Sequence, residues 1–190
     1  MNTRRIVTVG ALTCMLLGAL LLGNGAYIYA KAQLAQVLLQ HAWARTLAGE
    51  HNVKPWPWAD TWPVARLRSP THDIDVVVLA GDSGRVLAFG PGHHFGSASP
   101  TQLGHSLISA HRDTHFRFLK DMALNEEVQV QNAHGEWHRY RVVETRVLDA
   151  HDVGFAHVTD QSALSLITCY PFDALLPGGP LRFVLTAIEV

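Results

Sequence analysis

The sequence predicts an all-β domain, either a barrel or a sandwich, behind one long apolar helix near the N-terminus. Residues 6–30 form an uncharged run in which Leu, Ala, Val, Gly and Ile predominate. From Ile74 onward, short runs of β-type residues are separated by Gly, Pro, Asn and Asp, as strands are separated by turns. The 190 residues leave room for this apolar segment and one domain, so we expect a single active site.

The apolar run Ile6–Ala30 contains 25 residues without a charge, and Arg4 and Arg5 precede it. About 20 such residues cross a bilayer, whereas the apolar core of a cleaved signal peptide has about 7–15. Ala30-Lys31-Ala32 resembles a cleavage site, so a removed signal is the alternative. The two arginines predict an N-terminus in the cytoplasm. We therefore expect residues 1–31 to be a cytoplasmic tip and transmembrane anchor in the inner (cytoplasmic) membrane, with the rest facing the periplasm.

Residues 32–60 are expected to form a helical stalk and an extended strap. Apolar residues keep a helical spacing from Ala32 to Glu50, and Gly49 provides a stop signal. The segment Lys54–Pro63 contains three prolines and three tryptophans, which exclude a regular helix or a central strand. Its tryptophans are expected either to pack on the domain or to lie at the membrane interface. The β-domain itself is expected over residues 61–190.

The strands are read from runs of β-type residues, and the clearest is Glu127–Gln131, where Val128 and Val130 alternate with Gln129 and Gln131. Phe116–Leu124 is expected to be a short internal helix. Seven or eight short strands imply a barrel or a sandwich. The expected strands are Asp75–Leu79, Val86–Phe89, Ser106–Ala110, Glu127–Gln131, His138–Leu148, Ala163–Thr168 and Leu181–Ile188.

Composition limits the possible functions. The chain has 15 Lys and Arg against 16 Asp and Glu, and this balance excludes a surface designed for nucleic acid. Of the two cysteines, Cys14 lies within the apolar run, so a disulfide with Cys169 is implausible. Cys169 is therefore a lone thiol outside the membrane, either a reactive nucleophile or a buried small hydrophobe.

Three residue types suited to acyl transfer occur at the ends of expected strands. Cys169 ends the run Ala163–Thr168, His111 ends Ser106–Ala110, and Arg182 opens the strand that follows the loop 170–181. A thiolate attacks a carbonyl, an imidazolium protonates the departing amine, and a guanidinium donates to the developing oxyanion. The three side chains would form a complete catalytic set if the strands bring them together.

At these residues the sequence resembles the sortases, over most of the chain from about Trp56 to Val190. Ser165–Cys169 is similar to the family's Thr-Leu-x-Thr-Cys signature, and Gly104–Phe116 is similar to its strand ending in the catalytic histidine. Leu181–Val184 resembles the strand that carries its arginine. The segments Gly81–Ser83, Gly90–His93 and Cys169–Asp173 are more similar to the proteobacterial, Gram-negative branch. Two departures are Ser165 in place of Thr and Ala110 in place of Gly.

The resemblance implies an eight-stranded sortase-like β-barrel with an N-terminal membrane anchor and a cysteine transpeptidase activity. Cys169 would form a thioester with a protein bearing a C-terminal Leu-Pro-x-Thr-Gly-like sorting signal, His111 would shuttle the proton and Arg182 would hold the oxyanion. An amine acceptor of the cell envelope would then release the acyl group. The residues that the resemblance places near the substrate are Ala110, Leu166, Ile167, Thr168 and Tyr170.

Other interpretations remain open. The pairs His111/His115 and His134/His138 have i, i+4 spacing, but neither is expected on a helix, so we expect no metal and no cofactor. Asp113 is expected to cap the segment after Thr114 in preference to orienting His111. Two other classes of function are a periplasmic cysteine peptidase that releases its product to water and a non-catalytic, membrane-tethered binding barrel.

Overall fold

The computed structural model describes residues 3–151, 161–174, 176 and 178–190. The chain divides into two compact units, Met1–Val37 and Leu38–Val190. Helix α1 (Thr3–Leu47) runs through both. The other helical elements are η1 (Pro70–His72), α2 (Gly84–Leu87) and η2 (Arg117–Lys120).

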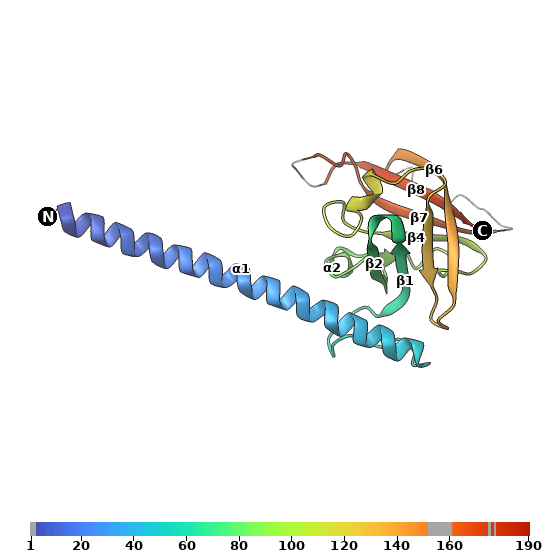
Figure 1. Ribbon diagram of the computed structural model, residues 1–190, viewed down its shortest axis with the longest axis horizontal. Coiled ribbons are helices and arrows are strands. Elements are labelled where there is room, and N and C mark those ends of the chain that lie inside the picture. Colours follow the sequence, from blue (N-terminus) through green and yellow to red (C-terminus); the bar gives the residue numbers. More distant parts are fainter. Residues whose placement is uncertain (1–2, 152–160, 175, 177) are drawn as a thin grey trace. The chain divides into compact units, whose positions relative to one another are not determined.

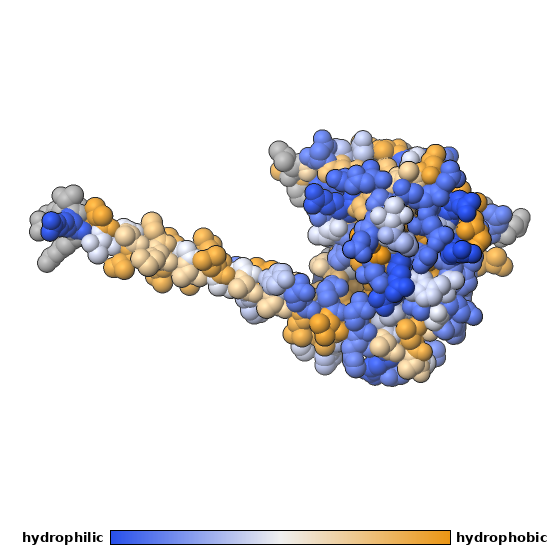
Figure 2. Space-filling model, in the orientation of Figure 1, coloured by the Kyte–Doolittle hydropathy of each residue, from blue (hydrophilic) through white to orange (hydrophobic). Residues whose placement is uncertain are grey.

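Helix α1 is a continuous helix of 45 residues that contains the apolar run. Figure 2 shows the apolar side chains as an orange stretch along it. Within the described part of the chain, it is the one helix long and apolar enough to cross a membrane, which is compatible with a single-pass anchor. Its C-terminus is closed by Gly49, whose φ of +94° favours glycine and whose N–H donates to the Thr46 carbonyl. The stop signal read from the sequence is therefore confirmed.

Eight strands form a closed barrel in the order β1-β2-β3-β4-β7-β8-β6-β5 (Figure 1). Neighbouring strands are antiparallel except for the parallel pairs β2–β3 and β4–β7. The predicted eight-stranded β-barrel is thus confirmed. The strands are β1 (Pro63–Ser69), β2 (Ile74–Ala80), β3 (Gly92–His93), β4 (Gly104–Ser109), β5 (Glu127–Gln131), β6 (Trp137–Asp149), β7 (Ser162–Cys169) and β8 (Leu181–Glu189).

Alternating side chains of the strands fill the barrel, as the period of two along a strand requires. Among the interior residues, Ile108 of β4, Leu166 of β7 and Leu185 of β8 are fully buried. Strand β7 is buried on both faces, because a second cluster of Leu107, Ile167 and Val184 covers its outer face. Burial on both faces explains why its sequence is a nearly continuous apolar run instead of an alternating one.

The expected strand Val86–Phe89 is wrong, because the structure has helix α2 at Gly84–Leu87. Val86 and Phe89 pack against the same hydrophobic cluster, as residues three apart on a helical turn do. A four-residue apolar run does not distinguish this spacing from a buried strand. Likewise, the helix expected at Phe116–Leu124 is only the four-residue η2.

Strands β1 and β3 were not expected from the sequence. Strand β1 does alternate, with Ala65 and Leu67 buried and Arg66 and Arg68 turned toward Asp75 on β2. The prolines and tryptophans before it obscured this signal. Strand β3 has only two residues, too few for any periodicity.

The last turns of α1 and part of the strap belong to the same compact unit as the barrel. Leu39 and Trp43, each 1% exposed, pack with residues of β2 and α2. In the strap, Trp56 contacts Phe89 edge-on at 4.9 Å between ring centroids, whereas Trp58 is 82% exposed. The division into a helical stalk and strap over residues 32–60 stays a prediction, and residues 38–60 of it belong to the compact unit Leu38–Val190.

Candidate active site

Strands β4 and β7 run parallel, so their C-terminal ends reach the same edge of the barrel. Ser109 lies opposite Ile167, and the Ala110 N–H donates to the Ile167 carbonyl at 3.1 Å. The buried Thr168 hydroxyl donates to the Ala110 carbonyl at 2.8 Å. Continuing this register by two residues places His111 beside Cys169, and both then belong to the outward-facing set of side chains.

Strands β7 and β8 bring Arg182 to the same place, because Cys169 pairs directly with Arg182. Directly paired residues of antiparallel strands point to the same face, with Cβ atoms about 4.5–5.5 Å apart. Nη1 of Arg182 donates to the Gly179 carbonyl at 2.7 Å and to the Leu181 carbonyl at 2.9 Å. Its Nε and Nη2 make no hydrogen bond to any residue that the structure describes, so they remain available as donors.

The three side chains differ in exposure in a way that suits acyl transfer. His111 is exposed, and Cys169 and Arg182 are half-buried at the same barrel edge. A half-buried thiol is accessible to a substrate carbonyl, while the imidazole beside it can exchange a proton with an amine that arrives from solvent. The sheet therefore pairs Cys169 with Arg182, and its register, continued beyond β4, places His111 next to them.

Comparison with known proteins identifies the family. The model of the Sortase domain matches residues 67–190, more than half of the chain. The chain belongs to the sortase family. It is 28% identical to Sortase D of Bacillus subtilis over 120 residues, which are 63% of this chain and 60% of that sortase.

Solved sortase structures have the same fold. Sortase A of Corynebacterium diphtheriae is 26% identical, with a TM-score of 0.62, over 70% of this chain and 63% of that one. Sortase C-1 of Actinomyces oris is 25% identical, with a TM-score of 0.59, over 67% and 74% of the two chains. A Sortase D5 transpeptidase of Clostridium perfringens is 17% identical and supports the fold alone, with a TM-score of 0.66 over 83% and 99%.

Arg112 is a residue of this sortase that the sequence reasoning missed. Its side chain is only 6% exposed and donates to the Pro171 carbonyl, to the Ala174 carbonyl at 2.9 Å and to the Asp113 carboxylate at 3.0 Å. The hydrogen bond to Asp113 raises the pKa of Arg112, and attraction to Cys169 acts in the same direction. Arg112 thus fastens the segment after His111 to the segment after Cys169.

The interpretation of Asp113 as a helix cap is wrong. Both of its carboxylate oxygens contact Arg112, and this hydrogen bonding lowers the pKa of Asp113. The N-cap position of η2 is Phe116, which makes no side-chain cap. A carboxylate next to a buried guanidinium is electrostatically more favourable than one at the start of a four-residue 3₁₀ helix.

We expect Arg112→Lys to lower kcat/KM about tenfold and to lower the melting temperature. A single ammonium group keeps the charge but cannot reproduce a guanidinium fork that reaches two carbonyls and a carboxylate. Steady-state kinetics and thermal unfolding measure the two effects. Arg85→Lys, at an exposed arginine of α2, is the matched control and should change neither quantity. A variant with a normal kcat but a raised KM would contradict a role in positioning His111 and Cys169.

The residues expected near the substrate are mostly inside the barrel. Leu166 is fully buried, and Ala110, Ile167 and Thr168 are buried as well, with the Thr168 hydroxyl already bonded to the backbone. Tyr170 is half-buried and contacts Phe172 edge-on. Substrate binding by these five residues stays a prediction. The four buried residues could contact a substrate only through their backbone groups.

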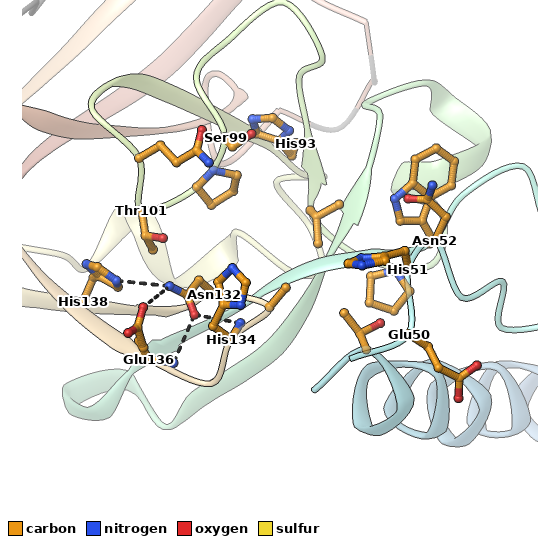
Figure 3. Close-up of a pocket in the computed structure, with 17 residues that line it drawn as sticks. Glu50, His51, Asn52, His93, Ser99, Thr101, Asn132, His134, Glu136 and His138 are labelled. Atoms are coloured by element: carbon orange, nitrogen blue, oxygen red, sulfur yellow. Dashed lines mark hydrogen bonds between the residues drawn. The ribbon is translucent and has the colours of Figure 1, made fainter. Parts of the chain in front are cut away.

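A cavity of about 390 Å³ lies away from the three candidate catalytic residues. It borders the loop before β4, whereas His111 follows the end of that strand. Figure 3 shows His51, His93, His134 and His138 around it, with Glu136 hydrogen-bonded to Asn132. Over the described ranges of the chain, no group of three His, Cys, Asp or Glu side chains is arranged to hold a metal ion.

His93, in the wall of this cavity, should make stability depend on pH. It is 7% exposed, its Nε2 donates to the Ala98 carbonyl at 2.8 Å, and burial lowers its pKa. Below pH about 6.5 the unfolded chain takes up a proton that folded His93 resists, so stability falls as the pH falls. Burial also lowers the pKa of the half-buried His115, which adds to the same trend.

We therefore expect His93→Gln to reduce the loss of stability between pH 7.5 and 5.5, because glutamine can keep the bond to Ala98 without titrating. Urea unfolding midpoints at the two pH values measure this difference. His134→Gln, at an exposed histidine of the same cavity, is the control. An unchanged pH dependence in His93→Gln, with His134→Gln also unchanged, would contradict the prediction.

Proposed function

We propose that this protein is a membrane-anchored cysteine transpeptidase. It cleaves a Leu-Pro-x-Thr-Gly-like sorting signal near the C-terminus of a protein substrate and transfers the acyl group to an amine acceptor of the cell envelope. Cys169 is the nucleophile, His111 the general acid and base, and Arg182 the oxyanion donor. The anchor holds the N-terminus in the cytoplasm and the barrel in the periplasm.

The observation that carries this proposal is the pairing of Cys169 with Arg182 at the edge where the segment carrying His111 is bonded to β7. The thiolate of Cys169 attacks the Thr carbonyl of the Thr-Gly bond in the signal, and the tetrahedral oxyanion accepts hydrogen bonds from Nε and Nη2 of Arg182. The imidazolium gives its proton to the departing amine, which leaves a thioester on Cys169. The neutral imidazole then takes a proton from the incoming amine, whose nitrogen displaces the thiolate.

Intact mass spectrometry of the full-length chain in detergent tests the proposal. The protein is incubated with a library of Leu-Pro-x-Thr-Gly-like peptides, with and without an added amine. A mass increase that matches the acyl part of one peptide and disappears into an amine-linked product supports transpeptidation. A thioester that turns over to the free acid at the same rate with and without amine would instead show a thiol-dependent peptidase. No adduct with any peptide would reject acyl transfer from such signals.

A further inference from the structure

A second cavity, of about 180 Å³, adjoins the candidate active site. Arg112 and Asp113 directly follow His111, and Phe172 lies three residues beyond Cys169. The cavity therefore lies between the two segments that carry the nucleophile and the acid/base. The residues that line it are Arg112, Asp113, Arg117, Lys120 and Phe172.

The lining carries an excess of positive charge. Arg112 and Asp113 neutralise each other through two hydrogen bonds. The Arg117 side chain is exposed and makes no hydrogen bond or ion pair with the residues described, and its charge attracts the Asp113 carboxylate. Lys120 has only Asp121 at 3.8 Å, and both of these side chains are largely exposed, which makes the pair weak. Arg117 and Lys120, which are held only by weak electrostatic interactions, thus leave the lining with a net positive charge that can attract an anion.

One wall of the cavity is apolar and fixed in position. The Phe172 ring contacts Phe183 edge-on at 5.2 Å and Tyr170 edge-on at 6.1 Å between centroids. Arg112 holds the backbone on both sides of Phe172 through the Pro171 and Ala174 carbonyls. A cavity with an apolar wall and a net positive charge from two weakly paired cations fits a carboxylate on a short aliphatic chain.

The acid/base role of His111 indicates which reactant brings that carboxylate. The imidazole must lie within about 3 Å of the nitrogen from which it removes a proton. Two residues of the lining interact electrostatically with the site, Asp113 with His111 and Arg112 with Cys169, so a carboxylate a few bonds from the reacting nitrogen is in reach of the cavity. We propose that this cavity is a carboxylate subsite for the acceptor, and that the acceptor is therefore an amine with a free carboxylate near its reacting nitrogen. This inference rests on the proposed transpeptidase function.

A binding experiment tests the subsite without requiring turnover. The full-length Cys169→Ala chain in detergent is titrated with glycylglycine or with glycylglycine amide, which differ in one charge, and backbone amide shifts are followed by NMR. Glycylglycine should shift residues 112–120 saturably and bind about five- to tenfold more tightly than the amide. The double variant Arg117→Gln/Lys120→Gln should remove this difference, and Lys54→Gln/Arg85→Gln, at two exposed cations elsewhere, should keep it. Equal affinities for the two dipeptides would overturn the subsite.

A kinetic experiment then identifies the source of the carboxylate. In the active protein, Arg117→Gln/Lys120→Gln should raise the KM for glycylglycine about five- to tenfold and the KM for its amide much less. High salt should reduce the preference in the unmodified protein, because the charges are exposed. An acylation rate that falls while the acceptor KM stays constant would place the carboxylate on the departing peptide and overturn the proposal. Carboxylate binding without any acylation would instead reject the proposed function and leave the subsite intact.

Discussion

Replacement of Cys169 with alanine is expected to abolish thioester formation and to lower kcat/KM by about 10⁴-fold or more. Alanine has no nucleophilic atom, and oxyanion stabilisation alone leaves only a small residual rate. The side chain is half-buried at a strand end, where the smaller alanine leaves the pairing with Arg182 intact. Mass spectrometry and transfer assays measure the loss, and thermal unfolding shows whether the barrel is unaffected.

The chain supplies its own control for this experiment. Cys14 is the second cysteine and lies in the apolar part of α1. Cys14→Ala should keep full activity and the full adduct mass. An acyl adduct that persists in Cys169→Ala but disappears in Cys14→Ala would reverse the assignment of the nucleophile.

Replacement of His111 with glutamine should lower kcat/KM for a peptide substrate about 10²–10⁴-fold. Glutamine keeps a hydrogen-bonding group of similar size but cannot deliver a proton to the departing amine. An activated thioester with the same acyl group needs no such proton, because a thiolate is a good leaving group. We therefore expect acylation of Cys169 by the thioester to fall less than tenfold in this variant.

His115 is the matched control, since it lies four residues further along the same segment and is half-buried. His115→Gln should have little effect on either substrate. His111→Gln could instead slow acylation of Cys169 by the peptide and by the thioester equally. The histidine would then act on the thiol or on its position, and general-acid catalysis of amine departure would be contradicted.

Much of the barrel and the three candidate catalytic residues could be predicted from the sequence. Strand β5 was predicted with its correct bounds, because Val128 and Val130 face the core while the glutamines between them are half-buried. Cys169, His111 and Arg182 were proposed because each lies at the end of an apolar strand-like run, where an ionisable or nucleophilic side chain is unusual. These signals arise from residues that are adjacent in the sequence, so they can be recognised without a structure.

Other features depend on contacts between distant residues and leave little local trace. In the sequence, nothing distinguishes Arg112 from an exposed arginine. In the structure it is buried, and backbone carbonyls about 60 residues away in sequence accept its hydrogen bonds. The basic cavity likewise combines η2 with the loop after Cys169. Helix α2 forms because one side of a single turn meets the last turns of α1, which the run Val86–Phe89 does not reveal.

The parallel pairing of β4 with β7 also has a consequence for the maturation of the protein. The hydrogen bond between Thr168 and Ala110 joins residues 58 positions apart, and Cys169 meets Arg182 only when β8, the last strand in sequence, has paired. Non-local pairings of this kind form late, because the intervening chain must first be ordered. During synthesis, the thiol would therefore gain its guanidinium partner only after almost the whole barrel has been translated. A chain that ends before β8 would hold Cys169 without this partner.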